Sequence, residues 1–141
     1  MIVGVYWSGG EVPSWRQECT DRFLSLYTDA TVLKFIDTSP CERFTAIRRA
    51  DVWKFEMAST YRDFLYIDSD IYLDSRLDLP KGPAVADEYG LKHWSIVWSG
   101  NDPSVFVGAN GSTIQKDERV VKVKLSGTHW ASDLQHNKVH R

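Results

Sequence analysis

The first third of the chain alternates short apolar runs with one helix-like stretch, and this order restricts the fold more than any other feature. Residues 2 to 7 form an apolar run that ends at a Gly-containing turn. Residues 15 to 27 carry apolar side chains at helical spacing, and residues 31 to 36 form a β-branched run. The order is β-α-β, which predicts an α/β fold with helices flanking a sheet.

The rest of the chain extends this pattern but becomes less regular toward its end. Residues 45 to 61 predict the longest helix, and residues 64 to 67 predict a short apolar strand. Extended segments are also expected at residues 71–73, 84–86, 94–98, 105–107 and 119–125, whereas residues 126–141 show no clear periodicity. A chain of 141 residues can bury one core, so we expect a single domain over residues 1–141.

Composition excludes several classes of partner. The charges of the 17 basic and 19 acidic residues nearly cancel. The chain therefore has no overall positive electrostatic field that would hold nucleic acid or an anionic membrane. No apolar run approaches the roughly 18 residues that a membrane span requires. Cys19 and Cys41 lack the spacing of a zinc site or a disulfide framework. We therefore expect a protein of a reducing compartment, cytoplasmic in type.

An acidic pair directly follows the predicted strand at residues 64–67. Asp68 and Asp70 are one residue apart, and at a strand-ending turn both carboxylates can converge on one cation. In open α/β sheets, ligands bind outside the carboxyl ends of the strands. The pattern predicts a divalent cation, Mn²⁺ or Mg²⁺, that is held by Asp68 and Asp70 and used in phosphate chemistry.

The longest predicted helix has a lysine within its apolar stripe. The predicted stripe consists of Ile47, Ala50, Trp53, Met57, Ala58 and Tyr61. Lys54 falls inside this stripe, and Asp51 lies at its edge one turn earlier. A lysine on an apolar face is costly unless its ammonium group reaches solvent or meets an anion. Two interpretations stay open: a local ion pair between Asp51 and Lys54, or contact of Lys54 with a bound anion.

The segment around the acidic pair resembles the GT-A glycosyltransferases, which have a Rossmann-like mixed sheet. The stretch from Leu65 to Ile71, Leu-Tyr-Ile-Asp-Ser-Asp-Ile, is similar to the glycogenin-like family 8 pattern, and Leu77-Asp78-Leu79-Pro80 also fits it. The resemblance implies that Asp68 and Asp70 bind a metal that bridges the diphosphate of a nucleotide-sugar donor. It also places Ser69, between the two carboxylates, within the donor site.

Two upstream segments are similar to glycosyltransferase family 32. Asp51 and Lys54 resemble the Asp and Arg of that family's Ser-Asp-x-x-Arg helix, which contact the donor sugar and its phosphates. Lys54 keeps the charge of that Arg but not its bidentate fork. Tyr6 and Trp7, followed by Gly9-Gly10, resemble the family's opening strand and turn beside the nucleotide. Core packing is the alternative role for Trp7.

Three downstream residues complete the predicted site. The segment containing Asn110 resembles the part of family 8 that lines the donor sugar, and Asp102 either faces the acceptor or begins a Pro turn. Family 8 also has a metal-binding His near its C-terminus, which implies His129 here. Two carboxylates and two diphosphate oxygens leave a divalent cation short of six ligands, and imidazole is acceptable to Mn²⁺. The alternative is that His129 is a surface residue beside a packed Trp130.

These features together predict a metal-dependent glycosyltransferase that uses a nucleotide-sugar donor, a UDP-sugar by resemblance, with retention of configuration. Its acceptor is an unknown glycan, protein or small molecule. Lys54 is expected to assist the departing diphosphate. Two alternatives remain open: a non-catalytic nucleotide-sugar or carbohydrate-binding protein, and a haloacid-dehalogenase-like phosphatase with Asp68 as nucleophile. The phosphatase motif has Thr or Val where Tyr72 stands, and it usually lies on the first strand.

Overall fold

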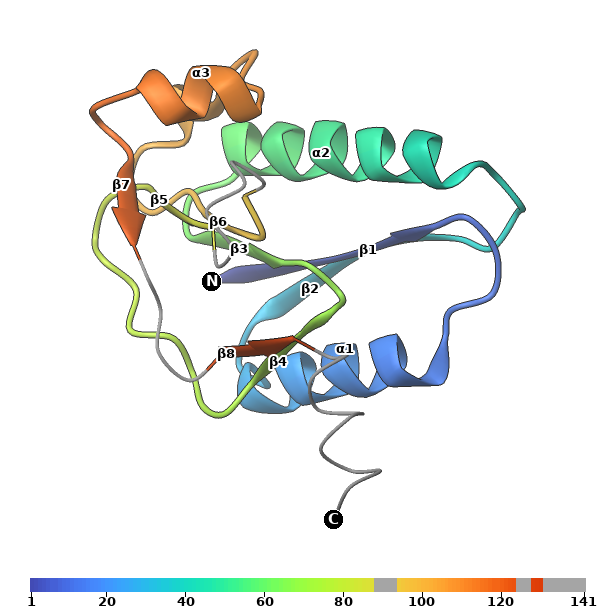
Figure 1. Ribbon diagram of the computed structural model, residues 1–141. Helices are drawn as coiled ribbons and strands as arrows, with labels where there is room; N and C mark the ends of the chain where they lie inside the picture. The colour runs from blue at the N-terminus through green and yellow to red at the C-terminus, as the bar shows by residue number, and fades with distance from the viewer. Residues whose placement is uncertain (88–93, 124–127, 131–141) are drawn as a thin grey trace.

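A mixed six-stranded sheet forms the centre of the molecule. The computed structural model describes residues 1–87, 94–123 and 128–130, with only the backbone placed at residues 129 and 130 (Figure 1). The strand order of this sheet is β2-β1-β3-β6-β5-β7. Its strands are β1 (Ile2–Ser8), β2 (Thr31–Asp37), β3 (Phe64–Ile67), β5 (Ala84–Ala86), β6 (Ile96–Trp98) and β7 (Val121–Val123). The predicted mixed α/β sheet flanked by helices is confirmed.

The β-α-β order creates the parallel half of the sheet. Strand β1 pairs in parallel with β2 and β3, so the carboxyl ends of these strands lie at the same edge. Helix α1 (Ser14–Leu26) covers one face of the sheet and α2 (Arg43–Thr60) covers the other (Figure 1). Side chains of β3 alternate between the two cores: Phe64 and Tyr66 face α2, whereas Leu65 and Ile67 belong to the core beneath α1.

Helix α2 packs mainly through the predicted apolar stripe: Ala58 is in the core, and Ala50, Trp53, Met57 and Tyr61 pack against it. Its buried residues are Lys54, Phe55 and Ala58, whereas Ile47, expected on the apolar face, is 41% exposed. Phe55 stacks on Phe106, with the ring centroids 6.1 Å apart. A partner from late in the chain therefore buries a residue of α2 that lies outside the predicted stripe.

The second half of the sheet is mainly antiparallel. Strand β6 pairs antiparallel with β3 and β5, and β5 pairs in parallel with β7.

Two short helices lie between β6 and β7. The prediction of a strand at residues 105–107 is wrong, because residues Pro103–Phe106 form the 3-10 helix η1. The side chain of Asp102 caps η1 by accepting a hydrogen bond from the backbone N–H of Ser104. The short helix α3 (Gly111–Lys116) follows.

A small second sheet lies beside α1. Strand β4 (Ile71–Leu73) follows the acidic pair, packs against α1, and pairs antiparallel with β8 (Thr128–Trp130). In this register Tyr72 lies opposite His129. Strand β8 was not predicted, since its three residues stand in a segment without periodicity.

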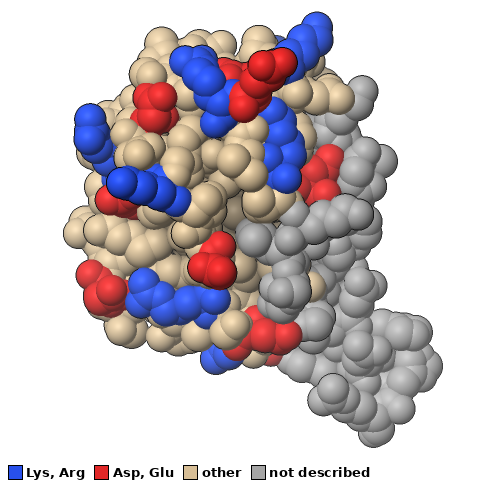
Figure 2. All heavy atoms as spheres, turned by 90° about the vertical axis from the view of Figure 1, so that its left-hand side faces the viewer, with Lys and Arg blue, Asp and Glu red and all other residues tan. Residues whose placement is uncertain are grey.

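Charged side chains of both signs occupy the same face of the molecule (Figure 2). On the face at the β7 edge of the sheet, basic and acidic side chains are interspersed (Figure 2). Just before β7, Arg119 and Asp117 form an ion pair, with Nη2 and Oδ2 2.7 Å apart. None of the helices in the described part of the chain is long and apolar enough to span a bilayer.

Candidate functional site

The carboxyl ends of β1 and β3 open into a cleft of about 630 Å³. Parallel strands end at the same sheet edge, and the loops that follow them form the walls of this cleft. Helix α2 supplies one wall, and the turn after β3 supplies another. We call this hollow the cleft; its lining residues are Tyr6, Trp7, Ser8, Gly9, Arg16, Cys41, Arg43, Ala46, Ile47, Ala50, Asp51, Tyr66, Asp68, Ser69 and Asp70.

The cleft brings together six residues that the sequence predicted for the site. Asp68, Ser69 and Asp70 come from the turn after β3, Asp51 from α2, and Tyr6 and Trp7 from the end of β1. Trp7 is half-buried, and its indole N–H donates to the carbonyl of Gly10 at 2.7 Å. Tyr6 is 7% exposed and stacks on Phe35 of β2. The ring of Tyr6 therefore belongs largely to the core.

The hydroxyl of Tyr66 contacts one carboxylate and feels the charge of two others. This hydroxyl donates to Oδ1 of Asp68 at 2.7 Å. Burial, reinforced by the negative charges of Asp68, Asp51 and Asp70, raises the pKa of Tyr66 well above its ordinary value of 10.0. Tyr66 is therefore a fixed hydrogen-bond donor to Asp68. Oδ1 of Asp70 is shielded from solvent in the same region.

Lys54 lies behind the wall of the cleft rather than among the residues that line it. Its ammonium group is 2.9 Å from Oδ1 of Asp51 and donates to the carbonyl of Trp94 at 2.6 Å. It also lies 5.5 Å from the centre of the Tyr66 ring. The local ion pair with Asp51, one of the two interpretations left open by the sequence, is present. Through that pair Lys54 orients a carboxylate that faces the cleft.

Asp102 and Asn110 are outside the lining of the cleft. Oδ1 of Asp102 is bonded to the backbone and hydroxyl groups of Ser104, in agreement with the Pro-turn alternative. The side chain of Asn110 caps α3 by accepting from the N–H groups of Ser112 and Thr113 at 3.0 and 3.1 Å. The metal-binding prediction for His129 concerns a side chain outside the described part of the structure.

Several cleft residues were missed by sequence reasoning. Tyr66 precedes Asp68 by two residues, so the alternation of a strand already places both on one side. Arg16 is the third residue of α1, and Arg43 is the first residue of α2. Both helix starts follow strands that end at this edge, which is a signal that topology could have provided. Nothing in the sequence around Cys41, which lies in the loop between β2 and α2, indicates that it lines the cleft.

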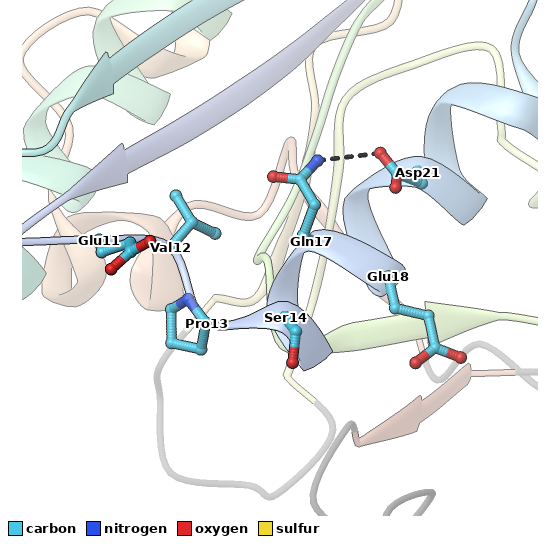
Figure 3. A pocket seen from close by; sticks show the side chains of 7 residues that line it. All are labelled: Glu11, Val12, Pro13, Ser14, Gln17, Glu18 and Asp21. Atoms are coloured by element: carbon cyan, nitrogen blue, oxygen red, sulfur yellow. Dashed lines mark hydrogen bonds between the residues drawn. The ribbon is translucent and has the colours of Figure 1, made fainter.

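A second hollow lies at the start of α1, away from the predicted residues. Figure 3 shows its lining: Glu11, Val12, Pro13, Ser14, Gln17, Glu18 and Asp21. Gln17 donates to Asp21 at 2.9 Å, and the three acidic side chains point in different directions (Figure 3). In the described part of the chain, no group of three or more His, Cys, Asp or Glu side chains is arranged to hold a metal ion.

Comparisons with known proteins indicate a fold relationship. No protein-family model matches the chain, and no curated protein matches it. Among solved structures, the chain is similar to a glycosyltransferase involved in the glycosylation of the major capsid of PBCV-1. The TM-score is 0.50 and the identity 13%, over 87% of this chain and 81% of that one. The fold of the two proteins is shared.

Proposed function

We propose that the chain is a glycosyltransferase that transfers a sugar from a nucleotide-sugar donor to a glycan, protein or small-molecule acceptor. The observation that carries this proposal is that Asp51, Asp68 and Asp70 line one cleft at the carboxyl ends of β1 and β3. In an open α/β sheet this edge is where ligands bind. The fold shared with a glycosyltransferase supports the same assignment.

The chemistry of the carboxylates fits a divalent cation such as Mn²⁺ or Mg²⁺. Carboxylate oxygens are the ligands that these hard cations prefer, and Mg²⁺ sites usually combine one or two carboxylates with substrate phosphates. Asp68 and Asp70 would hold the cation, with the donor's diphosphate as the remaining partner. When bound, the cation would neutralise the charge that develops on the departing nucleoside diphosphate.

The residues of the chain have separate roles in this proposal. Tyr66 fixes the orientation of Asp68, and Lys54 fixes that of Asp51. Asp51 lines the cleft and faces the donor sugar. In the reaction the bond between the anomeric carbon and the diphosphate breaks, a bond to an acceptor oxygen forms, and the acceptor hydroxyl loses its proton. Retention of configuration, a UDP-sugar donor and the metal-binding role of His129 rest on the sequence resemblance.

The test is a binding and turnover screen with the purified chain. Thermal melting is measured against a panel of nucleotide sugars with and without Mn²⁺, because a ligand that binds only the native state adds about 2.7 kcal/mol at a hundredfold excess over Kd. We expect stabilisation by a UDP-sugar only when Mn²⁺ is present, and release of UDP on incubation. Binding without turnover would identify a binding protein, and hydrolysis of para-nitrophenyl phosphate would identify a phosphatase; either result contradicts the proposal.

A further inference from the structure

The guanidinium group of Arg16 is held beside the acidic turn by aromatic stacking. Its Cζ lies 4.7 Å from the centre of the Trp15 ring and 5.3 Å from that of the Trp7 ring. Nη1 donates to the hydroxyl of Ser69 at 2.8 Å. Ser69 stands between Asp68 and Asp70, so a guanidinium from α1 is fixed against the middle of the acidic pair. Stacking on two rings limits the rotation of this side chain before any ligand arrives.

Most of the hydrogen-bonding capacity of Arg16 is unused within the described structure. A guanidinium has five N–H donors, and one of those of Arg16 bonds Ser69. Among the described residues, no carboxylate forms an ion pair with Arg16. The side chain is half-buried, and a partly desolvated cation without an anion is unfavourable. The arrangement is therefore suited to receive an anion from the cleft.

A second cation lines the same cleft. Arg43 is exposed at the first residue of α2, and no described carboxylate pairs with it either. The cleft thus contains two kinds of charge: carboxylates on the turn after β3 and on α2, and guanidinium groups from the starts of α1 and α2. A ligand that carries both a cation and phosphate oxygens can pair its cation with the carboxylates and its phosphate oxygens with the guanidinium groups.

We infer that Arg16, with Arg43 as a second cation, forms a phosphate-binding subsite that holds the diphosphate of the ligand. The inference rests on the proposed function and deepens it, since it assigns to Arg16 the direct contact with phosphate. The fork of Arg16 suits bidentate contact with phosphate oxygens. A diphosphate at Arg16 lies next to Ser69, and so beside the two carboxylates that would hold the metal.

The test uses inorganic pyrophosphate as the probe, titrated calorimetrically without added metal. The variant Arg16→Met keeps an apolar stem and removes the charge. The control Arg48→Met makes the same charge change on α2, at an exposed arginine outside the lining of the cleft. We expect Arg16→Met to weaken pyrophosphate binding by about 10- to 100-fold, the range for a lost charge-assisted hydrogen bond, and Arg48→Met to leave it unchanged.

A further variant shows whether a loss of pyrophosphate binding comes from the missing guanidinium or from a disturbed fold. Arg16→Lys keeps the charge but not the fork, so it should bind pyrophosphate with intermediate affinity at an unchanged melting temperature. Equal affinity in wild type and Arg16→Met overturns the inference, and so does an equal loss in Arg48→Met, which would indicate only general electrostatic attraction. Absence of pyrophosphate binding to wild type at low ionic strength overturns it as well.

A parallel titration with UDP and Mn²⁺ separates this inference from the proposed function. If pyrophosphate binding depends on Arg16 but no UDP-sugar binds or turns over, the subsite stands and glycosyl transfer fails. If UDP-sugar is turned over equally by wild type and Arg16→Met, glycosyl transfer stands and the subsite fails.

Discussion

The ammonium group of Lys54 is enclosed in the protein, while its partner, the carboxylate of Asp51, reaches the cleft. The Lys54 side chain is 1% exposed, that of Asp51 is 41% exposed, and the two groups are 2.9 Å apart. A buried charge that loses its partner is destabilising, whereas a half-exposed one can be hydrated. The pair therefore couples the stability of the core to the position of one carboxylate in the candidate site.

Lys54→Met should lower stability, because the carbonyl of Trp94 loses its donor and Asp51 loses its cation. The expected loss is about 1 to 3 kcal/mol of unfolding free energy, the usual cost of an unsatisfied buried polar group. Chemical denaturation measures it, with the exposed Lys34→Met as control. The double variant Asp51→Asn/Lys54→Met should show coupling between the two positions. A change no larger than that of Lys34→Met would contradict a structural role.

Tyr66→Phe should alter the dependence of stability on alkaline pH. The pKa of Tyr66 is raised in the folded protein, so above pH 10.0 the unfolded chain loses this proton while the folded chain retains it. The unfolded state then binds fewer protons, and stability falls as pH rises. Unfolding free energies measured across this range should fall less steeply in Tyr66→Phe than in wild type. Parallel slopes for the two proteins would show that the hydroxyl is not held as described.

Gly9→Ala should be more destabilising than Gly10→Ala. Both glycines have positive φ, 103° and 100°, so an alanine at either position is strained by roughly 1 to 3 kcal/mol. Only at Gly9 would the added Cβ approach neighbouring atoms, 3.3 Å from Sγ of Cys41 and 3.4 Å from Cβ of Ala46. Because the backbone strain is similar at both positions, the difference in melting temperature between the two variants measures the crowding of the added Cβ against Cys41 and Ala46, which line the cleft. Identical melting temperatures would argue against it.

His129→Ala should weaken Mn²⁺ binding in the presence of UDP, if the resemblance to family 8 extends to this residue. The backbone of β8 places His129 opposite Tyr72 of β4, the strand that follows Asp70. Calorimetric titration of Mn²⁺ into the UDP-loaded chain measures the effect, and His136→Ala is the matched control. Unchanged Mn²⁺ affinity in His129→Ala would remove this residue from the proposed metal site.

The sequence alone predicted those elements whose structure depends on residues close together in the chain. The strands at residues 2–8, 31–37 and 64–67, and the position of Asp68 and Asp70 after β3, follow from local apolar runs and turns. The predicted apolar stripe of α2 packs on the core except at Ile47, which is exposed. Phe55, outside that stripe, is buried because it stacks on Phe106, which is distant in sequence. Residues 105–107 looked extended because two of the three are valines.

Long-range contacts also explain what was missed in the candidate site. Arg16 meets Ser69 across 53 positions of sequence, and no local pattern around α1 indicates that contact. Lys54 was singled out correctly as an unusual residue in an apolar stripe, but its enclosure depends on Trp94, 40 positions away. Asp51, Asp68 and Asp70 could be found from the sequence, whereas Arg16 and the direction in which each side chain points required the fold.

The most direct test of the account is the calorimetric titration of UDP into wild type and Asp70→Asn, each with and without Mn²⁺. Asp21→Asn, an exposed acid on α1 outside the cleft, provides the same change of charge as a control. We expect UDP to bind wild type and Asp21→Asn in a Mn²⁺-dependent manner, and this dependence to be lost in Asp70→Asn without a change in melting temperature. Binding of UDP and Mn²⁺ to Asp70→Asn with the affinity of wild type would contradict the account.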